Sequence, residues 1–176
     1  MSFSVVPLRL AGAMLLALSI TSVAPAARAA DAGIAAVGQR APKFLLETPA
    51  GGDVTLRTYA GKPLVLNVFA SWCPPCRAEL PLIVTSARRR PSVAYLGVDA
   101  QESAQIATTF ARSMSLPYPI AIDHGQFAAS YGAVSLPVTI FVDARGIVRA
   151  IQHGALDAAT LDRDLALIAP ARPNKS

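Results

Sequence analysis

Short apolar runs alternate along this chain with longer segments in which apolar residues recur every three or four positions. The unbroken runs are typical of strands, and the longer period is typical of amphipathic helices. Strands and helices that alternate, with a hairpin and a helix at the end, indicate an α/β fold with a mixed sheet. The predicted strands are residues 44–47, 53–56, 64–70, 93–99, 118–122, 138–142 and 147–152. The predicted helices are residues 75–89, 103–113, a turn or two at 126–131, and a last helix capped by Asp157.

Two of these segments carry more detail. Residues 64–70 are almost continuously apolar, as expected of a central strand that is covered on both faces. In the helix at residues 103–113, Ile106, Phe110 and Met114 stand at helical spacing. We expect these three side chains to belong to the core.

The two cysteines of the chain, Cys73 and Cys76, lie where the run at residues 64–70 ends and a helix begins. Redox enzymes place a Cys-x-x-Cys pair at such a junction, because helix N–H groups and the helix dipole favour a thiolate on the first cysteine. A structural disulfide is one alternative, but so short a loop restrains the unfolded chain little. A zinc site is another, but the only histidines, His124 and His153, lie far along the chain. The pair therefore predicts redox catalysis and no metal site.

The N-terminus has the pattern of an export signal. Arg9 precedes an apolar run at residues 10–23, and Ala27 and Ala29 are small residues at the positions that a signal peptidase recognises. We expect a signal peptide at residues 1–29 and a periplasmic location; the alternative is an uncleaved N-terminal anchor in the membrane. An oxidising compartment suits a mature chain whose thiols form one pair.

The remaining length suits one domain. We place this domain at residues 37–169, after a flexible lead-in at residues 30–39 and before a polar tail at residues 170–176. The chain has 16 basic and 11 acidic residues, and cleavage would remove Arg9 and Arg28. The remaining positive charge is small and no basic and aromatic stripe accompanies it, so nucleic acid is not an expected partner.

Two separated segments contain further motifs. Residues 67–79 run from Asn67 through Trp-Cys-Pro-Pro-Cys to Glu79, and residues 131–143 contain Pro137. These segments resemble the thioredoxin superfamily, and within it the exported TlpA/ResA-like thiol–disulfide oxidoreductases. The resemblance implies a thioredoxin-like three-layer sandwich with helices on both faces of a mixed β-sheet, an extra N-terminal β-hairpin and a central insertion. It also implies a cis peptide bond before Pro137, which would face the cysteines.

The position of the cysteines predicts their roles. Cys73, at the helix N-terminus, is expected to be the attacking thiolate, and Cys76 the more buried thiol that resolves the mixed disulfide. Pro74 and Pro75 lack backbone N–H groups and stiffen the loop between them. Fewer donors stabilise the thiolate less, so we expect a modest lowering of its pKa, which favours a reductant over a strong oxidant.

Glu79 lies one helical turn beyond Cys76. It is a candidate acid–base group, because a neutral carboxylic acid can pass a proton to a thiolate and a carboxylate raises a neighbouring thiol pKa. The alternative is a solvated residue that the helix dipole favours.

Substrate contacts are expected around the pair. If the bond before Pro137 is cis, the backbone at Leu136 can pair with an extended substrate strand beside Cys73. Trp72 would offer contact area next to the thiols, with a mostly core position as the alternative. The exposed loop of Pro74 and Pro75 completes the expected substrate-binding set. The chain departs from its relatives at Val138 and at Ser135-Leu136, where they often have Thr and a glycine, and these departures bear on partner specificity.

The resemblance implies an exported reductant of disulfides in other proteins, without a cofactor. Its implied partners are apocytochrome c or copper-site proteins, and a membrane thiol reductant that recharges the pair. Two alternatives stay open: a disulfide-forming oxidant and a copper-binding metallochaperone. A peroxidase is disfavoured, because Cys73 lacks the Thr/Ser-x-x-Cys context of those enzymes.

Overall fold

The structure, a computed structural model, describes residues 1–2 and 33–169 of the chain. The expected signal peptide at residues 1–29, beyond its first two residues, lies outside the described residues, and so does the tail at residues 170–176. Within the described part, no helix combines the length and the apolar character needed to cross a bilayer.

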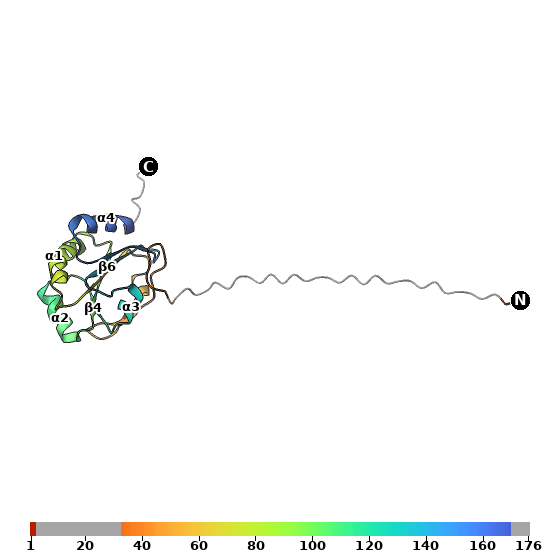
Figure 1. Ribbon diagram of the computed structural model, residues 1–176, viewed down its shortest axis with the longest axis horizontal. Helices are drawn as coiled ribbons and strands as arrows, with labels where there is room; N and C mark the ends of the chain where they lie inside the picture. Colours follow the sequence, from red (N-terminus) through yellow and green to blue (C-terminus); the bar gives the residue numbers. More distant parts are fainter. Residues whose placement is uncertain (3–32, 170–176) are drawn as a thin grey trace, which may run out of the picture.

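A seven-stranded mixed sheet forms the centre of the described domain (Figure 1). The strand order is β2-β1-β5-β4-β3-β6-β7. The three central strands β5, β4 and β3 are parallel, whereas the hairpins β1–β2 and β6–β7 join them in the antiparallel direction. The strands are β1 (Leu45–Glu47), β2 (Asp53–Thr55), β3 (Leu64–Phe69), β4 (Ala94–Ala100), β5 (Ile120–Asp123), β6 (Val138–Val142) and β7 (Val148–His153).

Helices cover both faces of this sheet, which confirms the predicted sandwich. They are α1 (Pro74–Arg89), α2 (Ala104–Ser113), α3 (Gln126–Tyr131), α4 (Ala158–Ile168) and the short 3-10 helix η1 (Leu56–Tyr59). The apolar faces of α1, α2 and α4 pack on one side, and α3 packs on the other together with η1 and the segment that enters the domain. Figure 1 shows α1 and α2 on the opposite side of the sheet from α3.

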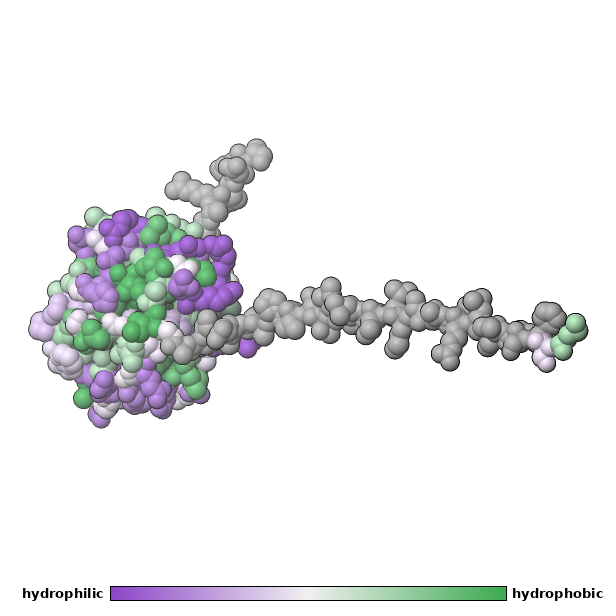
Figure 2. Space-filling model, turned by 45° about the vertical axis from the view of Figure 1, so that its right-hand side comes forward, coloured by the Kyte–Doolittle hydropathy of each residue, from purple (hydrophilic) through white to green (hydrophobic). Residues whose placement is uncertain are grey.

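The predicted elements are all present, with boundaries that differ by one or two residues. Asp157 caps α4 as expected, since its carboxylate accepts from the N–H of Thr160 at 2.7 Å. The predicted core of α2 is wrong at one position: Phe110 is buried and Met114 is partly buried, but Ile106 is 48% exposed. Ala107 takes the buried place instead, because the face of α2 that meets the sheet is rotated by one residue from the predicted one. Apolar and polar residues are interspersed on the face seen in Figure 2. Single exposed apolar side chains such as Ile106 are common on protein surfaces.

The flexible lead-in predicted at residues 30–39 is also wrong in its described part. Ala35 is buried and its N–H donates to Ser130 O at 2.8 Å. The N–H of Gly38 donates to Val148 O at 2.8 Å, and Arg40 forms a bridge with Ile147. A small side chain that fits the core, and backbone groups that pair with β7, fix this segment although its composition resembles a linker.

The register between β3 and β6 positions the redox site. Asn67 lies opposite Thr139, and Val68 lies opposite Val138. The end of β3, which leads into the cysteine pair, therefore lies beside the start of β6, which follows Pro137. β3 is buried along its whole length, so this junction rests on a rigid central strand.

Candidate active site

Helix α1 begins at the cysteine pair. Cys73 is its N-cap residue, and Pro74 and Pro75 occupy the first helical positions. The two cysteines form a disulfide, with Cα atoms 5.3 Å apart. The N–H of Cys76 donates to Cys73 Sγ at 3.2 Å, whereas the two prolines have no N–H to donate. The first sulfur thus lies at the helix N-terminus, as the sequence predicted.

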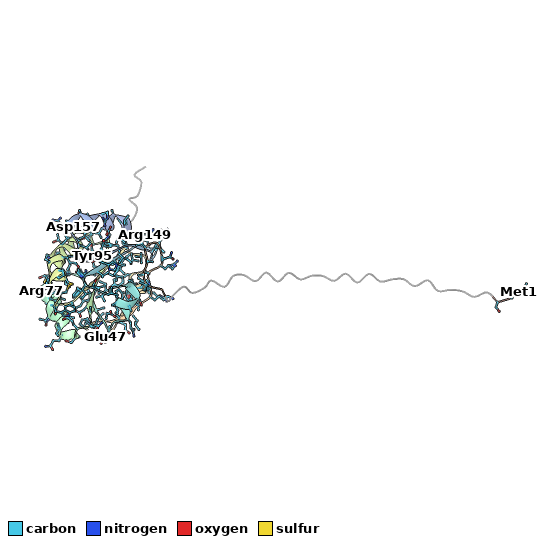
Figure 3. The ribbon with its side chains drawn as sticks, viewed as in Figure 1. Met1, Glu47, Arg77, Tyr95, Arg149 and Asp157 are labelled. Carbon is cyan, nitrogen blue, oxygen red and sulfur yellow. A yellow bond between two sulfur atoms is a disulfide. The ribbon has the colours of Figure 1, made fainter. Side chains whose placement is uncertain are left out.

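The surroundings of the pair are partly buried and partly exposed. Cys73 is 3% exposed and Cys76 is fully buried. Trp72 is 68% exposed, so the alternative that places it mostly in the core is wrong. Pro74 and Pro75 are exposed as well. Arg77, which directly follows Cys76, is labelled in Figure 3 at the outer edge of the domain beside α1 and α2.

Pro137 lies beside this junction. The Leu136–Pro137 peptide bond is cis, as the resemblance implied, and Pro137 is buried. Leu136 is half-buried and packs against the apolar cluster that contains both cysteines. The carbonyl of Pro137 accepts from the N–H of Gly154 at 2.9 Å, which ties this turn to the end of β7. The structure therefore brings Leu136 and Pro137 to the cysteine pair from 60 or more residues along the chain.

Glu79 is buried in the same region, so the alternative of a solvated glutamate is wrong. Only 3% of the residue is exposed to solvent. Oε1 accepts from Asn67 Nδ2 at 2.8 Å, and Oε2 accepts from the N–H of Leu156 at 2.8 Å. Burial raises the pKa of Glu79 above its ordinary value, although both hydrogen bonds act in the opposite direction. A buried carboxyl group that holds its proton more tightly than usual suits proton exchange with a thiol.

The partners of Glu79 were not identified from the sequence. Asn67 Nδ2 also donates to Thr139 Oγ1 at 3.0 Å, so β3, β6, α1 and the loop before α4 meet at one buried polar cluster. Asn67 Oδ1 is buried and accepts no hydrogen bond from a described residue. The available signal was a polar residue inside an otherwise apolar strand, because a buried polar side chain requires partners.

The histidines lie in different places relative to the site. His153 ends β7 opposite Val138, so it is closer to Pro137 than its sequence position indicated. His124 lies after β5, in the turn before α3. Among the described residues, no group of three His, Cys, Asp or Glu side chains is arranged to hold a metal ion.

Comparison with known proteins agrees with this geometry. Residues 37–151 match the AhpC/TSA family. The chain belongs to this family. It is 34% identical over 134 residues to the thioredoxin-like protein YneN of Bacillus subtilis, covering 74% of this chain and 79% of that protein. It is 33% identical over 138 residues to the thiol–disulfide oxidoreductase ResA of Geobacillus kaustophilus, covering 77% and 79%.

Solved structures give the same result. A thiol:disulfide interchange protein DsbE from Chlorobium tepidum, described as putative, superposes with a TM-score of 0.70 at 26% identity and covers 77% of this chain and 99% of that one. A secreted disulfide oxidoreductase of Mycobacterium tuberculosis superposes with a TM-score of 0.64 at 25% identity and covers 70% and 94%. With its Cys73–Cys76 pair, the protein is a thiol–disulfide oxidoreductase of the ResA/DsbE type with a thioredoxin-like fold.

Proposed function

We propose that the protein is an exported reductant, which delivers two electrons to disulfides of other proteins. The observation that carries this proposal is the poor supply of donors at the Cys73 sulfur. Cys76 provides the backbone N–H seen at that sulfur, and the two preceding helix positions are prolines. A weakly stabilised thiolate makes the reduced pair a better electron donor, whereas strong oxidants have a highly stabilised reduced form.

The reaction begins with the reduced pair. The Cys73 thiolate attacks one sulfur of the partner disulfide; a Cys73–partner disulfide forms, and the other partner sulfur leaves as a thiolate that takes up a proton. Cys76 then loses its proton and attacks Cys73 Sγ. The Cys73–Cys76 disulfide forms, and the second partner sulfur leaves and is protonated. The partner is reduced by two electrons and the pair is oxidised by two.

Glu79 supports the second step in this proposal. It lies one helical turn from Cys76 and shares its buried environment. As a carboxylate, it can take the proton of the Cys76 thiol, which has no access to bulk water at that depth. As a carboxylic acid, it returns a proton to Cys76 when the disulfide is reduced again. The raised pKa of Glu79 brings the two forms closer in free energy at neutral pH.

The partner docks across Trp72, Pro74, Pro75 and Leu136 in this proposal. The exposed indole and the two exposed prolines provide apolar contact area next to the sulfurs. Leu136, directly before the cis bond, provides backbone groups for an extended partner segment. Such contacts place the partner disulfide near Cys73 without a deep pocket.

The partners we propose are apocytochrome c or proteins with copper-site cysteines, in the periplasm. The export signal at residues 1–29, either cleaved or retained as an anchor, would direct the domain to the periplasm. The secreted M. tuberculosis protein, which has the same fold, supports an oxidising destination. A thiol reductant in the membrane would restore the dithiol after each turnover.

The reduction potential tests the direction of electron flow. We expect a value near that of thioredoxin, at about −270 mV, when the pair is equilibrated with a thiol buffer. A value near about −120 mV, typical of a strong disulfide-forming oxidant, would reverse the assignment.

The partner and the attacking cysteine are tested by trapping. The Cys76→Ser variant should accumulate mixed disulfides through Cys73 in cells, and mass spectrometry identifies the attached protein. The matched Cys73→Ser variant should trap none. Adducts on Cys76 in that variant would contradict the roles of the two sulfurs.

A further inference from the structure

Two acidic residues, Glu102 and Asp99, lie behind the loop that precedes the cysteine pair. Glu102 lies in the turn between β4 and α2 and reaches Ser71, two residues before Cys73. Glu102 Oε2 accepts from the N–H of Ser71 at 2.6 Å, and Oε1 accepts from Ser71 Oγ at 2.6 Å. Two short bonds to one carboxylate fix the position of Ser71 and therefore the path of the chain into Trp72 and Cys73.

Asp99 stands behind this contact. It lies near the end of β4, opposite Phe69 in the neighbouring strand, and is fully buried. Its Oδ1 accepts from the N–H of Glu102 at 3.2 Å, while Oδ2 is buried and has no hydrogen-bond partner among the described residues. Gln101, between the two acids, adopts φ +65°, a conformation that residues other than glycine rarely take. The turn thus holds two carboxyl groups close together at a cost in backbone strain.

No cation of the described part forms an ion pair with Asp99. The other charged groups on the surrounding elements are committed elsewhere or exposed. Arg77 of α1 donates to Ser71 O and lies over the ring of Phe110. Glu79 of α1 is hydrogen-bonded to Asn67 and to the N–H of Leu156. Arg112 is exposed near the end of α2. Asp123 of β5 accepts from three backbone N–H groups at the start of α3 and just before it.

Two acidic groups without a cation cannot both carry a charge at low cost. Burial, and then the charge of the nearby Glu102, raises the pKa of Asp99 to about 7, although the backbone N–H of Glu102 acts in the opposite direction. An ionised oxygen that is buried and without a hydrogen-bond partner is costly, so Asp99 is a neutral acid below neutral pH.

We propose that Asp99 is a positioning residue for the active-site loop: by holding or releasing one proton beside Glu102, it decides whether Glu102 keeps Ser71 in place. With Asp99 neutral, Glu102 carries the only charge of the pair and Ser71 supplies its two donors. With Asp99 ionised, repulsion drives Glu102 toward solvent and both bonds to Ser71 are lost. Trp72 and Cys73 then lose the anchor that precedes them. This inference concerns thiol–disulfide exchange at Cys73 and does not depend on the direction of electron flow.

Trp72 reports directly on this loop, because it is the only tryptophan of the chain and follows Ser71. Its fluorescence is measured in the purified oxidised protein, in which neither cysteine titrates, from about pH 5 to about pH 9. We expect a single transition with a midpoint near pH 7. The Asp99→Asn variant, which keeps an oxygen for the N–H of Glu102, should abolish the transition. The Glu79→Gln variant should retain it.

Three results would overturn the proposal: no transition in the wild-type protein, an unchanged transition in Asp99→Asn, or its loss in Glu79→Gln. If Asp99→Asn does not fold, as judged by circular dichroism, Ser71→Ala replaces it. Ser71 is half-buried in a loop, so this variant should fold. Losing one of the two bonds weakens the anchored, protonated form, so the midpoint should fall below the wild-type value. A midpoint equal to that of the wild type would show that Asp99 and Ser71 are not coupled.

Discussion

Replacing Glu79 by glutamine separates its proton transfer from its structural role. The change keeps the shape of the side chain and removes the ionisable proton. One oxygen of the substituted amide can still accept from the N–H of Leu156, now 2.8 Å from Glu79 Oε2. The amide nitrogen then faces Asn67 Nδ2, and two donors cannot pair.

Asn67 can resolve this conflict by rotating its own amide. Its Oδ1, which is buried without a described partner, would then accept from the substituted amide, and the hydroxyl of Thr139 could donate to the same oxygen. One unsatisfied polar atom is thereby exchanged for another. We expect Glu79→Gln to change the free energy of unfolding by no more than about 1 kcal/mol. Glu79→Leu instead leaves the N–H of Leu156 without an acceptor and should destabilise the domain by about 1–3 kcal/mol.

Exchange should respond quite differently from stability. Positioned acid–base groups contribute roughly 10²- to 10⁴-fold, so Glu79→Gln should slow release of the mixed disulfide by at least about tenfold. Stopped-flow mixing of the reduced protein with a disulfide-containing peptide measures the two steps, and urea unfolding of the oxidised protein measures stability. Glu47→Gln, at an exposed carboxylate on β1, is the matched control and should behave as wild type in both assays.

The pH dependence of stability adds an independent check. Because the pKa of Glu79 is raised in the folded state, the folded protein binds this proton more tightly than the unfolded chain does. This contribution is fully present below the unfolded value of about 4.3 and is lost as pH rises through the folded value. The Gln variant lacks this loss, so its stability relative to wild type should increase with pH. Wild-type rates in Glu79→Gln, together with wild-type pH dependence, would refute the acid–base role.

The remaining predictions concern the core, an ion pair and the cis proline. Phe110→Ala should lower the free energy of unfolding by about 3–5 kcal/mol, because the ring is buried. Ile106→Ala, on the exposed face of the same helix, should change it by less than about 0.5 kcal/mol. Equal losses of the two variants in urea unfolding would contradict the observed orientation of α2. Burial acts to raise the pKa of Asp143, but hydrogen bonds from Ile147, Arg149 and Arg145 outweigh it and lower the pKa. The stability that this lowering provides is present above about pH 3.9 and is lost as pH falls through the pKa of Asp143 in the folded state. Asp143→Asn should therefore destabilise the domain in urea unfolding at pH 7 and not at pH 2. Pro137→Ala should lower kcat/KM at least several-fold more for a protein disulfide than for a small-molecule disulfide, because the backbone at Leu136 can pair only with an extended partner segment. Equal effects on both substrates would argue against docking of the partner at Leu136.

The sequence by itself determined the parts of this protein that depend on local signals. Apolar runs and helical spacing located the strands and helices, and the Cys-x-x-Cys pair between a strand and a helix predicted the redox chemistry. Asp157 was identified as a helix cap because a cap depends on residues within one turn. The family motifs added the cis bond at Pro137, which periodicity alone does not indicate.

Only the tertiary structure decided how the polar groups around the cysteines are used. The acceptor of Asn67 lies 12 residues away on a helix, and its other partner, Thr139, lies 72 residues away on an antiparallel strand. Ser71 and Glu102, which are hydrogen-bonded, are likewise far apart in the sequence, by 31 residues. Burial, which raises the pKa of Glu79 and Asp99, depends on which elements cover a side chain, and the spacing of residues along the chain does not contain that information. The exposure of Ile106 was missed on the same ground, since a helix presents several candidate faces and the sheet selects one.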